Sequence, residues 1–208
     1  MDQKFRFLIA SGPTQEPLDP VRFLSNYSTG AMGKSLNAAA KKRGHRVTWV
    51  QCPRDAQTAR ALQKKLGILL PKHDALVMAA AVADARPMSI SKEKIKKDTL
   101  RTIRLVKNPD ILAALSKKKK KDQVFIGFAL ETRDPFVHAL EKLRRKKLDA
   151  ILLQTVTTNK TPFGDKRIGA FLIEKDGSKT VFKSASKNKI AGFLVRKAEA
   201  FLLSKARD

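Results

Sequence analysis

Short apolar runs alternate with amphipathic segments along most of the chain. Runs of about four to eight apolar residues are typical of buried strands, and apolar positions three to four residues apart are typical of helices. The predicted strands are 5–10, 46–51, 75–81, 124–129 and 150–153, and the predicted helices are 33–43, 56–66, 109–117 and 135–147. Gly44 fits a C-terminal helix cap, and Pro109 fits a first helical position. Strands that alternate with helices predict an α/β fold with a mostly parallel sheet covered on both faces.

The pattern changes after residue 155. Two apolar segments flank the turn residues 175–178, which predicts an antiparallel hairpin over about 168–183. Residues 187–203 then show helical spacing and predict a closing helix. We find no repeat and no Pro/Gly/Ser-rich linker, so we expect one domain over residues 1–208.

A second irregular segment lies between Asp84 and Leu105. Arg86 and Pro87 interrupt helical spacing, a lysine-rich stretch occupies 92–97, and a β-like stretch follows at 100–105. We expect residues 85–106 to form an arm or flap that leaves the sheet.

A long polar stretch, residues 11–35, follows the first strand and runs into the first helix. Compact connections of this kind usually span about two to six residues, so the extra length suggests a ligand. Backbone N–H groups at the start of a helix favour an anion. Asn26, Ser28 and Thr29 could cap the helix or hydrogen-bond a phosphate or carboxylate, and spacing alone leaves both roles open. The guanidinium of Arg22 could donate two parallel hydrogen bonds to a carboxylate or phosphate.

Two common nucleotide-binding patterns are incomplete in this loop. Gly33, Lys34 and Ser35 resemble the end of a P-loop, but Ser28 stands where its first glycine belongs. Gly30 and Gly33 supply only the last half of a dinucleotide fingerprint. These glycines would still permit close packing of helix and ligand.

Small side chains mark the ends of two later strands. Residues 79–83 are Ala-Ala-Ala-Val-Ala, and 127–129 are Gly-Phe-Ala. Ligands bind at the carboxyl ends of parallel strands, and small residues there leave room for a flat ring. Asp84 could accept from a ribose or base, bind a metal, or occupy a simple turn. Asp110 stands near the start of a predicted helix.

Composition narrows the classes of function. The net charge of +25 is compatible with nucleic acid, an acidic surface or a polyanionic ligand, but aromatic content is only 6%, so we do not expect specific nucleic-acid binding. The single cysteine, Cys52, excludes an internal disulfide and favours a reducing cytoplasm. No apolar run reaches the roughly 20 residues of a membrane span, and no signal peptide follows Met1. We therefore expect a cytoplasmic protein that does not bind membranes.

Five motifs together resemble one family, the phosphopantothenate–cysteine ligases (phosphopantothenoylcysteine synthetases). They are SGPTQEPLDPVRFLSNYSTGAMG, AAAVADARP, EKIKKD, LVKNPDIL and GFALET, and they cover most of residues 5–150. The resemblance implies a Rossmann-like fold with a dimerisation arm. Because a flavin-dependent decarboxylase precedes this domain in many bacteria and is absent here, the chain resembles a bacterial stand-alone ligase.

The resemblance also implies the reaction. The phosphopantothenate carboxylate would attack the α-phosphorus of a nucleoside triphosphate, and the amine of L-cysteine would then attack the acyl nucleotide. The bacterial-style motifs favour CTP over ATP, with Mg²⁺ bridging the phosphates. A homodimer is implied, in which the arm of one subunit helps to close the site of the other.

The family motifs carry functional roles to matching positions here. Asn26 and Lys94 match the catalytic positions, and the metal ligands are left open. The candidate substrate-binding positions are Arg22, Asn26, Ala80 and Ala81. The candidate nucleotide-binding positions are Gly12, Ser28, Thr29, Gly30, Ala79, Ala80, Ala81, Asp84, Lys94, Pro109, Asp110, Ile111, Leu112, Phe128, Lys142 and Lys146.

Two segments depart from the family pattern. Leu153, Gln154 and Thr155 stand where Ala-Asn-Asp is usual, and residues 53–74 form a shorter segment than usual. Two other functions stay open from the residues alone. One is an NAD(P)-dependent Rossmann oxidoreductase. The sequence disfavours this function because it has no Tyr-x-x-x-Lys pair: Tyr27 is the only tyrosine, and no lysine stands four residues after it. The other is a basic nucleic-acid-binding module.

Overall fold

The protein is described by a computed structural model that covers residues 3–156, 162–164 and 166–207. A seven-stranded sheet forms its centre, with the strand order β11-β10-β9-β8-β5-β1-β4. The parallel part consists of β4 (Arg46–Gln51), β1 (Arg6–Pro13), β5 (Ala75–Ala81), β8 (Val124–Glu131) and β9 (Ala150–Thr155). The antiparallel pairs β9–β10 and β10–β11 extend the sheet on one side, where β10 is Ile168–Glu174 and β11 is Lys179–Ala185. The predicted mostly parallel sheet and C-terminal hairpin are both confirmed.

Helices cover both faces of the sheet, and alternate side chains of each strand supply the two cores. Phe7 and Ile9 of β1 pack on one face with α1 (Ala31–Lys42) and α5 (Lys187–Lys205). Leu8 and Ala10 pack on the other face with α2 (Ala59–Leu69), α3 (Ile111–Ser116) and α4 (Pro135–Arg145). This alternation follows from the two-residue period of a strand. The short 3₁₀ helix η1 (Leu70–Lys72) ends the α2 segment.

Helix boundaries differ from the predicted ones where a side chain caps the helix. α3 begins after Asp110, whose carboxylate accepts from the N–H of Ala113 over 3.1 Å. Pro109 therefore precedes the cap, and its predicted first helical position is wrong. α2 begins later than predicted because Thr58 caps it through the N–H of Ala61. Gly44 directly follows Arg43, the C-cap residue of α1, and has φ +80°. This confirms the predicted role of Gly44 at the end of that helix.

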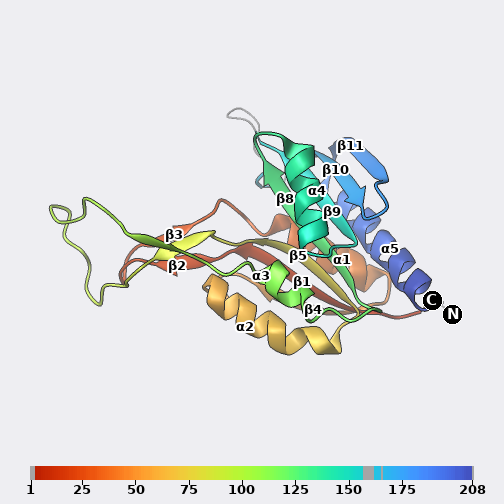
Figure 1. Ribbon diagram of the computed structural model, residues 1–208, viewed down its shortest axis with the longest axis horizontal. Coiled ribbons are helices and arrows are strands. Elements are labelled where there is room, and N and C mark those ends of the chain that lie inside the picture. The colour runs from red at the N-terminus through yellow and green to blue at the C-terminus, as the bar shows by residue number, and fades with distance from the viewer. Residues whose placement is uncertain (1–2, 157–161, 165, 208) are drawn as a thin grey trace.

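Two short antiparallel ladders lie outside the central sheet. β2 (Gln15–Pro17) pairs with β3 (Phe23–Ser25), and β6 (Ala85–Pro87) pairs with β7 (Leu105–Lys107). Between β6 and β7, residues 88–104 reach away from the sheet as the predicted arm (Figure 1). The expected strand at 100–105 is wrong for 100–104, because only Leu105 pairs, opposite Pro87.

Candidate active site

The long loop after β1 owes its length to the β2–β3 hairpin. The chain turns at Gly12, which has φ +82° and where a Cβ would lie 2.2 Å from the carbonyl oxygen of Cys52. The buried carboxylate of Glu16 anchors the hairpin by accepting from the N–H of Ala59 over 2.8 Å. The loop then returns to the sheet edge as residues 25–30 and enters α1. The extra length predicted for a ligand is thus ordered structure that delivers residues 25–30 to this edge.

A cavity of about 540 Å³ opens at the carboxyl edge of the sheet. Volumes of about 300–1,000 Å³ are typical of small-molecule sites. Its wall combines the loop before α1, the ends of β5 and β8, and the loop 162–164. The lining residues are Ser25 to Gly33, Ala79 to Val82, Phe128 to Leu130, Gln154, Pro162 to Gly164, and Lys187.

Asn26 is fixed between two walls of the cavity. Its Nδ2 donates to the carbonyl of Val82 over 2.9 Å. Behind it, Thr14 is fully buried, and its carbonyl accepts from the hydroxyl of Ser25 over 2.6 Å. The Thr14 hydroxyl also accepts from the N–H of Ala83 over 3.0 Å. An amide carries two donor hydrogens and an acceptor oxygen, so Asn26 retains one hydrogen and Oδ1 for a ligand.

Backbone and small side chains shape the start of α1. Gly30 occupies the N-cap position with φ +70°, and the hydroxyls of Ser28 and Thr29 accept from the N–H groups of Gly30 and Ala31 over 3.3 and 3.4 Å. The helix packs closely on β1, because a Cβ on Gly33 would lie 2.1 Å from the Cβ of Ser11. The remaining N–H groups of the first turn have no acceptor inside the helix, which favours an anion beside them.

Lysine supplies positive charge at the rim of the cavity. Lys187 opens α5, and its Nζ donates to the carbonyl of Pro162 over 2.9 Å and to that of Gly164. α5 reaches this point because it packs beside α1, where Ser35 donates to Asn188 over 2.7 Å. Sequence reasoning missed Lys187 because its place depends on this packing between segments about 150 residues apart.

The structure brings many of the predicted site residues together. The cavity is lined by Asn26, Ser28, Thr29, Gly30, Ala79, Ala80, Ala81 and Phe128. Gly12 lines an adjoining hollow of about 290 Å³ that shares Thr29, Gly30 and Ala31 with the cavity. Gln154, the departure from the family pattern, also lines the cavity. Tyr27, Met32, Leu130 and Phe163 are lining residues that the sequence analysis did not select.

A second group of predicted residues gathers beside the cavity rather than in its wall. The backbone N–H of Asn108 donates to the carbonyl of Asp84 over 2.8 Å, so the loops before α3 and after β5 lie side by side. Asp110 forms ion pairs with Lys146 at 3.0 Å and with Arg145 at 3.2 Å. Burial raises the pKa of Asp110, but the hydrogen bonds and charges of these neighbours outweigh it and hold the pKa below its usual value. This carboxylate is therefore an anion.

The other nucleotide-site candidates have different surroundings. Lys142 forms an ion pair with Glu131 at 2.5 Å, at the end of β8. Ile111 and Leu112, the first two residues of α3, are buried in the core. Pro109 is half-buried in the loop before this helix.

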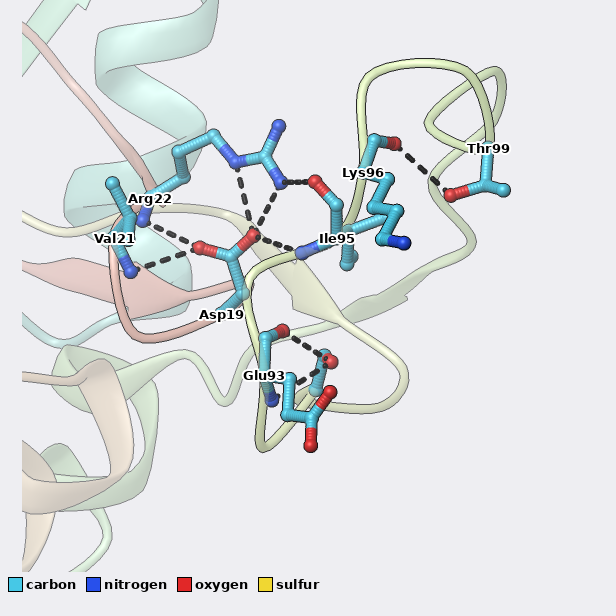
Figure 2. A network of polar contacts seen from close by, with 8 residues as sticks. Asp19, Val21, Arg22, Glu93, Ile95, Lys96 and Thr99 are labelled. Atoms are coloured by element: carbon cyan, nitrogen blue, oxygen red, sulfur yellow. Dashed lines mark hydrogen bonds and ion pairs between the residues drawn. The ribbon is translucent and has the colours of Figure 1, made fainter.

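Arg22 and Lys94 lie outside the cavity wall. The guanidinium of Arg22 pairs with the buried carboxylate of Asp19 and donates to the carbonyl of Ile95 over 2.8 Å (Figure 2). Lys94 is exposed on the arm. The structure thus connects these two predicted residues to each other through Ile95, rather than to the cavity of the same chain.

Cys52 has the properties of a packing residue. It is buried at the end of β4, and burial followed by the charge of Asp55 raises the pKa of its thiol to about 12. The thiol is therefore protonated at neutral pH and is a poor nucleophile.

Two features are absent from the described residues. Within 3–156, 162–164 and 166–207, no group of three His, Cys, Asp or Glu side chains could hold a metal ion. In the same part of the chain, no helix is long and apolar enough to cross a membrane.

Comparisons with known proteins agree with this architecture. The family described as DNA/pantothenate metabolism flavoprotein C-terminal domain matches residues 3–202. A relative named cysteine/cysteine sulfinic acid decarboxylase, from an unknown prokaryotic organism, is 38% identical over 92% of this chain and 57% of its own length. The coenzyme A biosynthesis bifunctional protein CoaBC of Escherichia coli K12 is 36% identical over 84% of this chain and 47% of its own length.

A solved structure of the C-terminal domain of a CoaBC protein superposes with a TM-score of 0.78 at 28% identity, over 97% of each chain. This chain spans about half the length of the curated relatives it matches. The chain belongs to the family of DNA/pantothenate metabolism flavoprotein C-terminal domains.

Proposed function

We propose that this protein is a phosphopantothenate–cysteine ligase that acts in coenzyme A biosynthesis. The observation that carries the proposal is the cavity at the carboxyl edge of the sheet, in which Asn26 faces the small residues at the end of β5 beside the start of α1. The similarity to the CoaBC C-terminal domain supports the same assignment.

The first step joins the carboxylate of phosphopantothenate to CTP. A carboxylate oxygen attacks the α-phosphorus, the bond to the β-phosphate oxygen breaks, and pyrophosphate leaves, giving an acyl-CMP intermediate. This step accumulates negative charge, which positioned cations and N–H donors stabilise. Lys187 and the first turn of α1, which line the same cavity as Asn26, would bind an anionic group of the substrate, and Asn26 would orient the acyl carbon.

The second step forms the amide. The amine of L-cysteine attacks the acyl carbon, the bond from that carbon to the CMP phosphate oxygen breaks, and the amine loses a proton. Ala79 to Ala81 leave backbone and space for the intermediate, and Phe128 offers an apolar wall. The chemistry needs no nucleophilic side chain, which agrees with the protonated thiol of Cys52.

We assign the nucleotide to the group beside the cavity. The nucleotide would be held by the loops 83–84 and 108–110 and by two lysines, Lys142 and Lys146. Each lysine lies near a carboxylate. Mg²⁺ is usually bound through substrate phosphates, water and one or two carboxylates, so this site fits a magnesium–nucleotide complex with Asp84 the candidate carboxylate. The ion would neutralise phosphate charge. CTP rather than ATP follows from the family resemblance.

We further propose a cytoplasmic homodimer formed through the arm. Large apolar side chains of the arm and of β3 are exposed, which is unusual for a surface without a partner. Met88 is 66% exposed, Ile90 61%, Leu105 50% and Phe23 51%. A second copy of the chain would cover them.

Pyrophosphate release tests the function. The protein is mixed with phosphopantothenate, MgCl₂ and either CTP or ATP, with and without L-cysteine. We expect release with CTP and a cysteine-dependent amide product. A folded sample that releases no pyrophosphate with either nucleotide would refute the ligase.

A further inference from the structure

The turn between β2 and β3 holds a buried carboxylate. Asp19 is only 4% exposed, and its Oδ1 accepts from the N–H groups of Val21 and Arg22 over 2.9 and 2.8 Å. These two bonds fix the turn internally. They leave Oδ2 to interact with other parts of the chain.

Oδ2 reaches the arm, more than 70 residues away in the sequence. It accepts from Arg22 Nε over 3.0 Å and from the N–H of Ile95 over 3.2 Å. Arg22 Nη2, which also contacts Oδ2, donates to the carbonyl of Ile95 over 2.8 Å. Both backbone polar groups of Ile95 are therefore held by one Asp–Arg pair (Figure 2).

The attachment continues next to Ile95. The N–H of Ser91 donates to the carbonyl of Leu18 over 3.0 Å, in the same turn. Residues 91 and 95 are thus both tied to residues 18–22, and Lys94 lies on the short segment between them. Its own side chain stays exposed and points to no partner in the described contacts of this chain.

The charge state of the pair is stable. The hydrogen bonds from Arg22, against the opposing effect of burial, lower the pKa of Asp19 far below its ordinary value. The bonds from Val21, Ile95 and Arg22 N–H groups act in the same direction. The carboxylate of Asp19 is therefore ionised at neutral pH.

We infer that Asp19 and Arg22 are positioning residues, which hold the backbone of Ile95 so that Lys94 is presented to the reacting phosphate. This inference rests on the proposed ligase function and deepens it. The guanidinium of Arg22, a residue predicted to bind substrate, is engaged by Asp19 and Ile95 and lies outside the cavity wall of the same chain.

A double-mutant cycle tests this role. Pyrophosphate release at saturating CTP is measured for wild type, Arg22→Ala, Lys94→Gln and the double variant, and Asp19→Asn serves as a second disruption of the pair. Amide hydrogen exchange at Ile95 reports the attachment independently of activity. Arg6→Ala is the matched control, because Arg6 forms a similar two-nitrogen pair with Asp74 at the opposite end of β1.

We expect Arg22→Ala to speed exchange at Ile95 and to lower kcat by about 100-fold with little change in KM for phosphopantothenate, since small misplacements near reacting groups cost about that much. In the Lys94→Gln background the same change should cost less than about 2-fold, because residues that act through each other are not additive. Arg6→Ala should leave kcat and exchange at Ile95 unchanged.

Two results would overturn the role. One is additive losses in the cycle, and the other is fast exchange at Ile95 with an unaltered kcat. A wild-type protein that releases no pyrophosphate would instead refute the ligase function itself, and the positioning role with it, so the two failures are distinguishable.

Discussion

The side chain of Asn26 is bonded to the backbone of Val82, with Nδ2 donating to the carbonyl oxygen over 2.9 Å. The bond joins the loop before α1 to the end of β5, so it fixes both the direction of the amide and the width of the cavity between them. Removal of the amide should therefore affect orientation of a ligand more than folding.

For Asn26→Ala we expect a fall in kcat of roughly 100-fold, the size associated with loss of one positioned donor in an active site. Steady-state kinetics and thermal unfolding measure the two effects separately. Asn37→Ala is the control, since Asn37 is an amide on α1 outside the cavity wall and its buried Oδ1 has no partner among the described residues. Equal losses in both variants would contradict the assigned role.

Lys94→Gln should abolish most acyl-nucleotide formation while the protein stays folded. The lysine is exposed on the arm, so its charge contributes little to stability, whereas a cation at a developing phosphate charge contributes strongly to rate. The measurement is pyrophosphate release, with circular dichroism as the test of folding. Lys92→Gln, a neighbouring exposed arm lysine, is the control, and normal turnover by Lys94→Gln would remove that residue from the mechanism.

Gly12→Ala should destabilise the protein severely, by more than about 3 kcal/mol, because strain at a positive φ adds to a steric clash. The added Cβ would lie 2.2 Å from a backbone oxygen at φ +82°. Gly67→Ala in α2 is the opposite case, since a Cβ there meets nothing within 4 Å. It should stabilise the helix by about 0.5–1 kcal/mol. Urea unfolding of both variants checks the pair, and similar midpoints would contradict the geometry.

A buried charge cluster predicts how stability depends on pH. Asp149 accepts from the N–H of Phe125 over 2.7 Å and forms ion pairs with Lys119 at 2.6 Å and Lys205 at 3.0 Å. Burial opposes ionisation, but these partners outweigh it and lower the pKa of Asp149. A carboxyl whose pKa is lower in the folded state stabilises above its unfolded pKa of about 3.9, and this contribution is lost as the pH falls through the folded value.

We therefore expect the free energy of unfolding to fall as the pH drops below about 4, with a smaller slope in Asp149→Asn. The variant itself should lose about 3–5 kcal/mol at pH 7, because it leaves two partly buried lysines without their carboxylate. Urea unfolding at a series of pH values measures both effects. An unchanged slope in the variant would show that other carboxyls control acid unfolding.

The arm should control association. Ile90→Lys would place a charge where an apolar residue is 61% exposed, so we expect a dimer to dissociate into monomers. Light scattering on a sizing column measures the mass. Ile68→Lys, at a residue that is 64% exposed on α2, is the matched control. If both variants keep the mass of the wild type, the arm does not form the interface.

Local patterns predicted much of the fold but little of the connections between distant segments. β4 and β5 have the predicted bounds because each is a short run rich in apolar residues. The first four residues of β5 are buried, whereas β4 is mostly half-buried. α3 begins at Ile111 rather than at the predicted Pro109, because the side chain of Asp110 caps the helix. Asn26 and Ala80 could be placed near a site from their positions at segment ends. The contact of Arg22 with the arm could not be predicted in this way, because its hydrogen bond to Ile95 joins residues 73 positions apart.

The outer edge of the hairpin has a consequence for how copies of this protein can meet. Among the described residues, β11 is an edge strand with a neighbour on one side only. It carries exposed Lys179 and Lys183 and a register irregularity opposite residues 168–170. Charged side chains and bulges on an edge strand discourage the addition of a foreign strand. These features of β11 disfavour the growth of a continuous sheet from one molecule to the next.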